Sequence, residues 1–315
     1  MTSYGQLFLT ILPVFTIIAL GFVLRRVQWI AAEAEGTLLN LALKVAFPCL
    51  IFESVVRNPA LQQAGNVVLP PLLGFGLTVA GFGIAWYAGG ALGLKLGAGR
   101  RTFALTAGLA NYGYLPLPIA DAMFGPDVRA VLLVHNIGVE AAIWSAGILL
   151  LSGLSPRAGW RRLLNMPLFS LVFALAINLG GVGPHVPRAV LELAHALGAC
   201  AIPLGLLMTG ASLEPHLGSA RQLVTPRVSL AAGAVRLGLT PLVILAAAAW
   251  LPLSPELRRV LVLQAAMPSA VIPIILARVY GGQPLVAVQI VLATTVLALF
   301  TIPLWIQFGL RLVGG

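Results

Sequence analysis

Long apolar runs separated by short polar connections recur along the whole 315-residue chain. A helix needs about 20 consecutive apolar residues to cross the ~30 Å hydrocarbon core of a bilayer. Ten runs approach or exceed that length, at 7–24, 38–55, 67–92, 103–124, 131–151, 163–179, 190–213, 228–251, 260–280 and 285–310. The pattern predicts an all-α integral membrane protein with ten transmembrane helices and no soluble domain.

The composition agrees with a lipid environment. Hydrophobic residues make up 59% of the chain and charged residues only 9%, and the mean hydropathy is +1.00. Soluble globular proteins carry about 25% charged residues. A soluble protein with so little charge would expose large apolar patches and aggregate.

The net charge of +10 arises because acids are scarce, with nine Asp and Glu against 19 Lys and Arg. The bases lie in short loops, where they orient a membrane protein with its positive loops inside. We therefore expect anionic lipid headgroups as partners and no nucleic acid. An outside N-terminus gives eleven bases on the inner side (25, 26, 95, 100, 101, 157, 161, 162, 221, 227 and 278) and six on the outer side (57, 129, 188, 258, 259 and 311). This predicts a multi-pass protein of the cell membrane with both termini outside.

Motifs of enzymes and metal sites are missing from the sequence. It contains no H-E-x-x-H, G-x-S-x-G, Walker A or helix-opening G-x-G-x-x-G pattern. The two cysteines, Cys49 and Cys200, lie in separate apolar runs, and the four histidines have no metal-ligand spacing. We therefore expect no catalytic residue, no metal ligand and no cofactor.

A weak internal repeat relates the two halves. Residues 118–125 in the fourth run resemble 273–281 in the ninth, and 47–51 in the second resemble 202–206 in the seventh. Both pairs are five runs apart. An odd offset gives the halves opposite orientations in the membrane, as in many secondary transporters. This predicts two inverted five-helix repeats, 1–155 and 156–315.

Two of the runs contain paired prolines at matching places. The fourth has Pro116 and Pro118, and the ninth has Pro268 and Pro273. Proline removes a backbone donor and disfavours a continuous helix, and the freed backbone groups are tolerated only inside the protein or along a polar cavity. One explanation is a pair of simply kinked helices; the one we favour is a binding site at two broken helices. The candidate substrate-binding residues are Asn111, Tyr112, Gly113, Pro116, Pro118, Gln264, Pro268, Ser269 and Pro273.

Ionisable residues deep within the runs are a second indication of function, because such groups normally face a partner or a wet cavity. Lys44, His135, Glu140 and Arg236 are the candidates for charge or proton coupling. Glu140 could carry a proton or form an ion pair with Arg236 or Lys44. Lys44 could attract an anionic substrate or join two helices.

At these motifs the sequence resembles the auxin efflux carrier family, which includes bacterial permeases and the plant PIN-type exporters. The resembling stretches are 41–52, 108–119, 199–213 and 265–274, followed by 280–282. The resemblance implies a sodium/proton-antiporter-like fold in which broken helices 4 and 9 cross at their prolines. It also implies that Asn111 and the Pro268–Pro273 stretch line the substrate site. Many bacterial members carry an asparagine in the second break, where this chain has Ile272.

The function expected from the residues and the resemblance is secondary transport of a small organic anion by alternating access. Family substrates are dicarboxylates such as malate or malonate, or auxin-like monocarboxylates, and the driving force would be a proton gradient or the membrane potential. The alternatives are a sodium-coupled carrier of the bile-acid symporter type and a non-transporting membrane sensor or receptor. Scaffold helices rich in small residues could pair to form a homodimer.

Overall fold

A computed structural model describes residues 3–95, 99–152, 164–223 and 226–314. Within these ranges the chain is helical and has no β-strand; its one extended feature is an isolated antiparallel bridge between Ala110 and Ser269. The predicted boundary between the two halves, at 155/156, lies outside the described residues. The all-α class predicted from the apolar runs is confirmed.

Sixteen α-helices follow one another along the described chain. Their bounds are α1 Tyr4–Arg26, α2 Ala32–Leu41, α3 Phe47–Val55, α4 Gly65–Ala91, α5 Arg100–Gly108, α6 Pro116–Phe124, α7 Pro126–Ala142, α8 Ile148–Ser152, α9 Met166–Leu179, α10 Arg188–Gly198, α11 Ala201–Leu223, α12 Pro226–Ala234, α13 Thr240–Trp250, α14 Pro255–Ala266, α15 Ile272–Val279 and α16 Pro284–Val313. Short 3-10 turns lie at Pro59–Gln62 and Gly183–His185.

Within the described ranges, three π-helical turns join neighbouring helices into longer ones. They lie at Ala42–Ala46, between α2 and α3; at Ile143–Gly147, between α7 and α8; and at Val235–Leu239, between α12 and α13. In the last case Pro241 cannot donate to the carbonyl of Leu237 four residues before it. The indole Nε1 of Trp305 donates to that carbonyl instead, at 2.7 Å. A side chain of α16 thus replaces the missing helical hydrogen bond.

Among the described residues, seven helices are long and apolar enough to cross a membrane. They span Tyr4–Arg26, Ala32–Val55, Gly65–Ala91, Pro126–Ser152, Arg188–Pro215, Pro226–Trp250 and Pro284–Val313, and the apolar helix α9 is shorter. The second of them begins at Ala32, six residues before the predicted start at 38, because the polar stretch ahead of the apolar run is helical as well. The remaining predicted runs, 103–124 and 260–280, are each divided in the middle.

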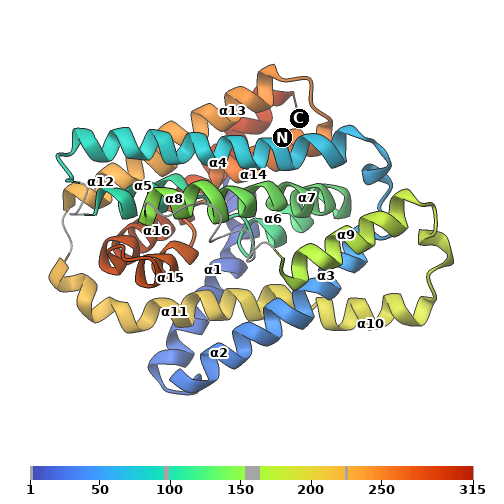
Figure 1. Cartoon of the computed structure of the whole chain (residues 1–315), viewed down its shortest axis with the longest axis horizontal. Coiled ribbons are helices and arrows are strands. Elements are labelled where there is room, and N and C mark those ends of the chain that lie inside the picture. The colour runs from blue at the N-terminus through green and yellow to red at the C-terminus, as the bar shows by residue number, and fades with distance from the viewer. Residues whose placement is uncertain (1–2, 96–98, 153–163, 224–225, 315) are drawn as a thin grey trace.

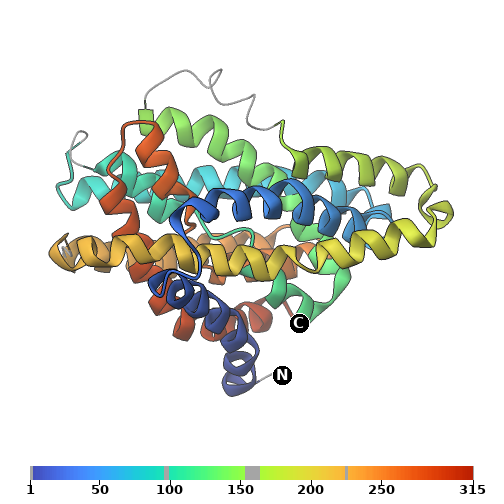
Figure 2. The ribbon, with the colours of Figure 1, turned by 90° about the horizontal axis from the view of Figure 1, so that it is seen from below.

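The helices pack as two bundles. We call α1, α2–α3, α9 and α10–α11 the scaffold bundle; α1 packs on α11, and α3 packs between α9 and α10. We call α4–α8 and α12–α16 the crossover bundle, in which α4 packs on α7 and α5, and α14 on α13, α16 and α7. In Figure 1, α4 runs across the upper part and α11 across the lower part, with the broken helices α5, α6, α14 and α15 between them. Figures 1 and 2 show the two termini on the same side of the molecule.

Within the scaffold bundle, α1 and α11 touch backbone to backbone at two glycines. A Cβ atom added to Gly21 would lie 2.1 Å from the carbonyl oxygen of Leu207, and one added to Gly210 would lie 1.8 Å from that of Ile18. Small residues at helix contacts are a common means of association in membranes, where lipid supplies no hydrophobic driving force. These two glycines set the distance between the two helices.

We expect Gly210→Ala to destabilise the protein, because the helices must separate to admit the new methyl group; overpacking of this kind costs about 1–3 kcal/mol. The matched control is Gly83→Ala in α4, where no atom lies within 4 Å of the added Cβ. The control should be neutral or slightly stabilising, since Ala is a better helix former than Gly by about 1 kcal/mol. Thermal unfolding in detergent measures both, and equal midpoints for the two variants would contradict the prediction.

Candidate functional site

The two broken helices cross at their interruptions, one between α5 and α6 and the other between α14 and α15. The backbone N–H of Asn111 donates to the carbonyl of Pro268 at 2.7 Å, and that of Ala270 donates to the carbonyl of Leu109 at 3.0 Å. These two hydrogen bonds form the antiparallel bridge of Ala110 with Ser269. The prolines that break each helix therefore leave backbone groups that the other broken helix satisfies.

Side chains from neighbouring helices satisfy further groups at the crossing. The carbonyl of Tyr112 accepts from the Asn136 amide of α7 at 2.8 Å and from the Gln264 amide of α14 at 3.5 Å. The N–H of Ser269 donates to the hydroxyl of Thr294 in α16, at 3.2 Å. Buried amides and hydroxyls thus take the place of water, as an apolar interior requires.

A cavity of about 230 Å³ lies between the two bundles at this crossing. Its lining is mostly apolar, with a few polar groups. The crossover bundle contributes Asn111, Tyr112, Gly113, Tyr114, Glu140, Ala270, Val271, Ile272 and Ile275, and the scaffold bundle contributes Glu35, Leu39, Leu43, Phe47, Gly205, Met208, Thr209 and Ser212. A mostly apolar cavity with a small number of polar groups is typical of small-molecule sites.

The cavity wall offers hydrogen-bond donors. Among the described residues, the backbone N–H groups of Gly113, Val271 and Ile272 have no acceptor, and all three residues line the cavity. Val271 is the N-cap of α15 and Gly113 precedes the first turn of α6, so both lie at positive helix ends. The side-chain amide of Asn111 also lines the cavity, with no hydrogen-bond partner in the described part of the chain. Donors at helix N-termini suit an anion.

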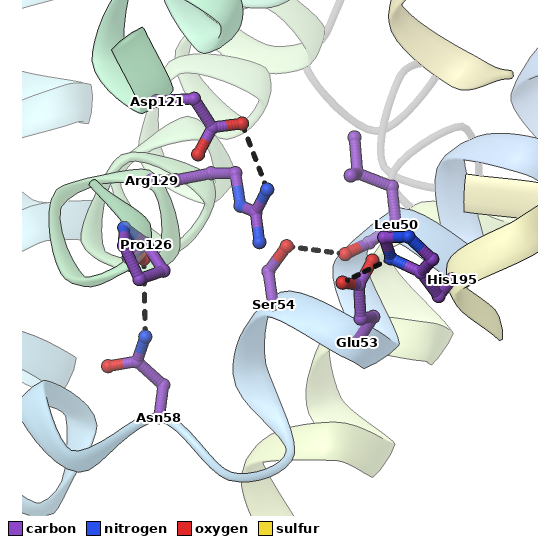
Figure 3. Close-up of polar contacts among 8 residues, drawn as sticks. All are labelled: Leu50, Glu53, Ser54, Asn58, Asp121, Pro126, Arg129 and His195. Carbon is purple, nitrogen blue, oxygen red and sulfur yellow. Dashed lines mark hydrogen bonds and ion pairs between the residues drawn. The ribbon is translucent and has the colours of Figure 1, made fainter. Parts of the chain in front are cut away.

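At the end of the molecule where α3 ends, away from the start of α2, a hydrogen bond joins the two bundles. Figure 3 shows the Asn58 amide of the scaffold side donating to the carbonyl of Pro126 at the start of α7, at 3.2 Å. It also shows Arg129 of α7 paired with Asp121 of α6 at 2.9 Å, which fastens the second half of the first broken helix to its own bundle. The cavity, by contrast, includes Glu35 near the start of α2. It therefore extends toward the end of the molecule at which α2 begins.

Within the scaffold bundle, the same view shows His195 of α10 against the carboxylate of Glu53 in α3, with Nδ1 and Oε1 2.9 Å apart. Ser54 donates to the carbonyl of Leu50 in its own helix. The first contact joins two scaffold helices and the second lies within one of them, and none of these residues lines the cavity between the bundles.

The four deep ionisable candidates have different surroundings. Glu140 lines the cavity and accepts a hydrogen bond from the Asn165 amide, the N-cap of α9, at 2.9 Å. His135 and Arg236 are buried and line a second, much smaller cavity behind the crossing. Lys44 is exposed on its π turn and lines none of the cavities described here. In the described ranges Glu140 forms no ion pair with Arg236 or Lys44.

The candidate substrate residues divide into two groups. Asn111, Tyr112 and Gly113 line the cavity directly. The others form its framework: Pro116 and Pro118 lie in the first turn of α6, Pro273 in that of α15, and Pro268 accepts from Asn111. Gln264 lines the smaller cavity, and Ser269 is buried with its hydroxyl unpaired among the described residues.

Sequence reasoning missed the scaffold side of the cavity. Met208, Thr209 and Ser212 line it, and Gly205 lies where an added Cβ would fall 1.9 Å from the ring of Tyr114, a cavity residue of the crossover bundle that was also missed. The scaffold residues could have been found from the family resemblance, because all four lie within 199–213, one of the stretches that carry it. They are Gly205, Met208, Thr209 and Ser212. Apolar periodicity gives no reason to select these positions in a membrane helix.

The comparisons with known proteins agree with this geometry. The family described as "Membrane transport protein" matches residues 6–159 and 151–306. An archaeal protein of Methanothermobacter thermautotrophicus, named "Uncharacterized transporter", is 27% identical over 301 residues, covering 94% of this chain and 96% of the relative. "Auxin efflux carrier component 8" of Arabidopsis thaliana is 22% identical over 334 residues, covering 86% and 89%. The chain is thus a multi-pass membrane transport protein. It belongs to the auxin efflux carrier family.

We expect Asn136→Leu to destabilise the crossing, because it removes the shorter of the two hydrogen bonds to the Tyr112 carbonyl. Leaving such a buried acceptor underpaired costs about 1–3 kcal/mol. Asn40→Leu is the matched control, since Asn40 is exposed on α2 and its side chain makes no hydrogen bond within the described residues. The thermal midpoint in detergent should fall for Asn136→Leu only. An unchanged midpoint would mean that the hydrogen bond at 2.8 Å contributes nothing.

Proposed function

We propose that this protein is a secondary carrier of a small organic anion and works by alternating access. The observation that carries the proposal is the cavity between the bundles, which is lined by residues at the N-terminal ends of two broken helices and by Asn111. We further propose ten spans in two inverted repeats. Support comes from the helices of the described residues. The seven long helices and α9 give eight spans, and the two divided helices bring the total to ten.

Further support for the repeat comes from the family match, whose two segments overlap at 151–159, around the proposed boundary at 155/156. The distribution of basic residues supports both termini outside, and the cavity would then open to the cytoplasm. The Asn58 contact with Pro126 would lie on the closed, outer side. Movement of one bundle against the other would break this contact and expose the crossing to the outside.

The lining favours a monocarboxylate with an apolar body over a dicarboxylate. In the part of the chain that the structure describes, no basic side chain lines the cavity, and two acids do, Glu35 and Glu140. One carboxylate can be bound by Asn111 and the free N–H groups, whereas a second would lie among apolar side chains or near the acids. The volume, about 230 Å³, is below the ~300–1,000 Å³ of pockets for drug-sized ligands. The auxin carrier named among the relatives is consistent with this substrate class.

The test is flux of labelled indole acetate, lactate, malate and malonate in proteoliposomes under an imposed potential or pH gradient. Asn111→Ala should lower flux of the transported monocarboxylate about 10- to 100-fold, because a hydrogen bond to a charged group is worth ~1.5–3 kcal/mol. The matched control, Asn40→Ala, removes an exposed amide from α2 and should leave flux unchanged. Flux equal to wild type in Asn111→Ala, or flux of malate alone, would refute the site or the substrate class respectively.

We propose Glu140 as the proton carrier if a proton gradient drives the transport. Its carboxylate lies at the cavity wall and contacts Asn165 across the bundle interface, so its charge affects both substrate and bundle movement. Glu140→Gln keeps an acceptor for Asn165 and cannot titrate. We expect it to abolish accumulation driven by a pH gradient and to retain substrate exchange at equal pH on both sides. Undiminished accumulation would assign the driving force to the membrane potential, which supplies about 2.3 kcal/mol per charge per 100 mV.

A further inference from the structure

Arg236 has the largest fully buried side chain in the described part of the chain, with 1% of its surface exposed. It lies on the π turn Val235–Leu239 and points into the crossover bundle. None of the ion pairs formed by the described residues includes it. A buried guanidinium without an acid is unfavourable unless other groups supply negative charge.

The ends of two half-helices supply that charge. Nη1 of Arg236 donates to the carbonyl of Gly108, the last residue of α5, at 3.5 Å. Nη2 donates to the carbonyl of Gln264, in the last turn of α14, at 3.4 Å. The C-terminal end of a helix carries about −0.5 elementary charge. Two such ends amount to about one negative charge, which a single guanidinium balances.

Arg236 does not belong to the substrate cavity. It lines the smaller cavity behind the crossing, with His135 and Gln264, and the two cavities share only Tyr112 among their lining residues. The guanidinium therefore neutralises the negative helix ends from behind. The positive ends of α6 and α15 lie on the other side of the crossing, beside the larger cavity.

Carbonyl oxygens at broken helix ends, together with nearby amide and hydroxyl oxygens, are the ligands by which carriers bind coupling cations. Here the carbonyls of Gly108 and Gln264 are bound by a cation that belongs to the chain. We propose that Arg236 is a tethered counterion that occupies the place of a diffusible coupling cation, so that transport needs no sodium. This inference rests on the proposed carrier function.

A small substitution at this position should create a vacant cation site. We expect wild-type flux to be equal in sodium and in choline medium, and Arg236→Lys, which keeps the charge, to retain at least a third of it. The flux of Arg236→Ala in choline medium should be at least tenfold lower than that of wild type. Guanidinium chloride at 10–50 mM should restore its flux at least fivefold and raise its thermal midpoint, since a ligand that binds only the folded protein stabilises it. Tetramethylammonium, which donates no hydrogen bond, should do neither.

The matched control is Arg25→Ala. Arg25 is also buried and donates to a backbone carbonyl, that of Ile30 at 2.9 Å, but it lies at the end of α1, away from the crossing. Guanidinium should neither activate nor stabilise this variant. A response equal to that of Arg236→Ala would overturn the inference, because it would mark a general effect of the salt.

The remaining outcomes also decide the matter. Three results would each overturn the proposal of a tethered cation. They are full flux of Arg236→Met in choline medium, a wild-type flux that depends on sodium, and an Arg236→Ala variant whose flux and thermal midpoint do not respond to guanidinium. If Arg236→Ala does not fold, the fluxes of Arg236→Lys and Arg236→Met are compared instead. An equal loss of flux in both variants would overturn the proposal. If wild type carries none of the anions tested, the carrier proposal fails, while the guanidinium-dependent thermal midpoint of Arg236→Ala still tests the cation site.

Discussion

The structure depends on one constraint: inside a bilayer, every backbone N–H and C=O must find its partner within the protein, since each one left unpaired costs several kcal/mol. The prolines of the two broken helices create such groups in the middle of the molecule. The crossing satisfies part of them mutually, through the hydrogen bonds of Asn111 with Pro268 and of Ala270 with Leu109. Neighbouring helices satisfy others through Asn136, Gln264 and Thr294.

The unpaired groups that remain are not distributed evenly. Carbonyls at the crossing are bound by side chains behind it, whereas several N–H groups without an acceptor among the described residues belong to residues that line the larger cavity. The polarity of the helices thereby determines the chemistry of the cavity: the free N–H donors belong to residues that line it, and the carbonyl acceptors are bound by side chains of the protein. Donors at helix N-termini suit an anion, so the proposed anion site needs no basic side chain.

Sequence reasoning located the interruptions because proline acts locally, and the paired prolines at 116/118 and 268/273 lie within a few residues of the observed breaks. Apolar run length likewise located the long helices. Contacts between distant segments could not be predicted in the same way. That Glu140 meets Asn165, and that Arg236 meets two carbonyls, depends on how the helices rotate and pack. The exposed position of Lys44 depends on its π turn, for which the sequence has no simple signal.

The contact between Gly205 and Tyr114 has a consequence for motion. Gly205 belongs to the scaffold bundle and Tyr114 to the crossover bundle, and the aromatic ring occupies the space that a Cβ on the glycine would fill. The ring fits into the space left by the absent side chain, and small displacements would bring it against neighbouring atoms. The two bundles therefore meet at a defined position, and the Tyr114 ring would have to leave this space before one bundle could slide along the other. The missing side chain at Gly205 thus fixes how closely the two bundles approach each other at this contact.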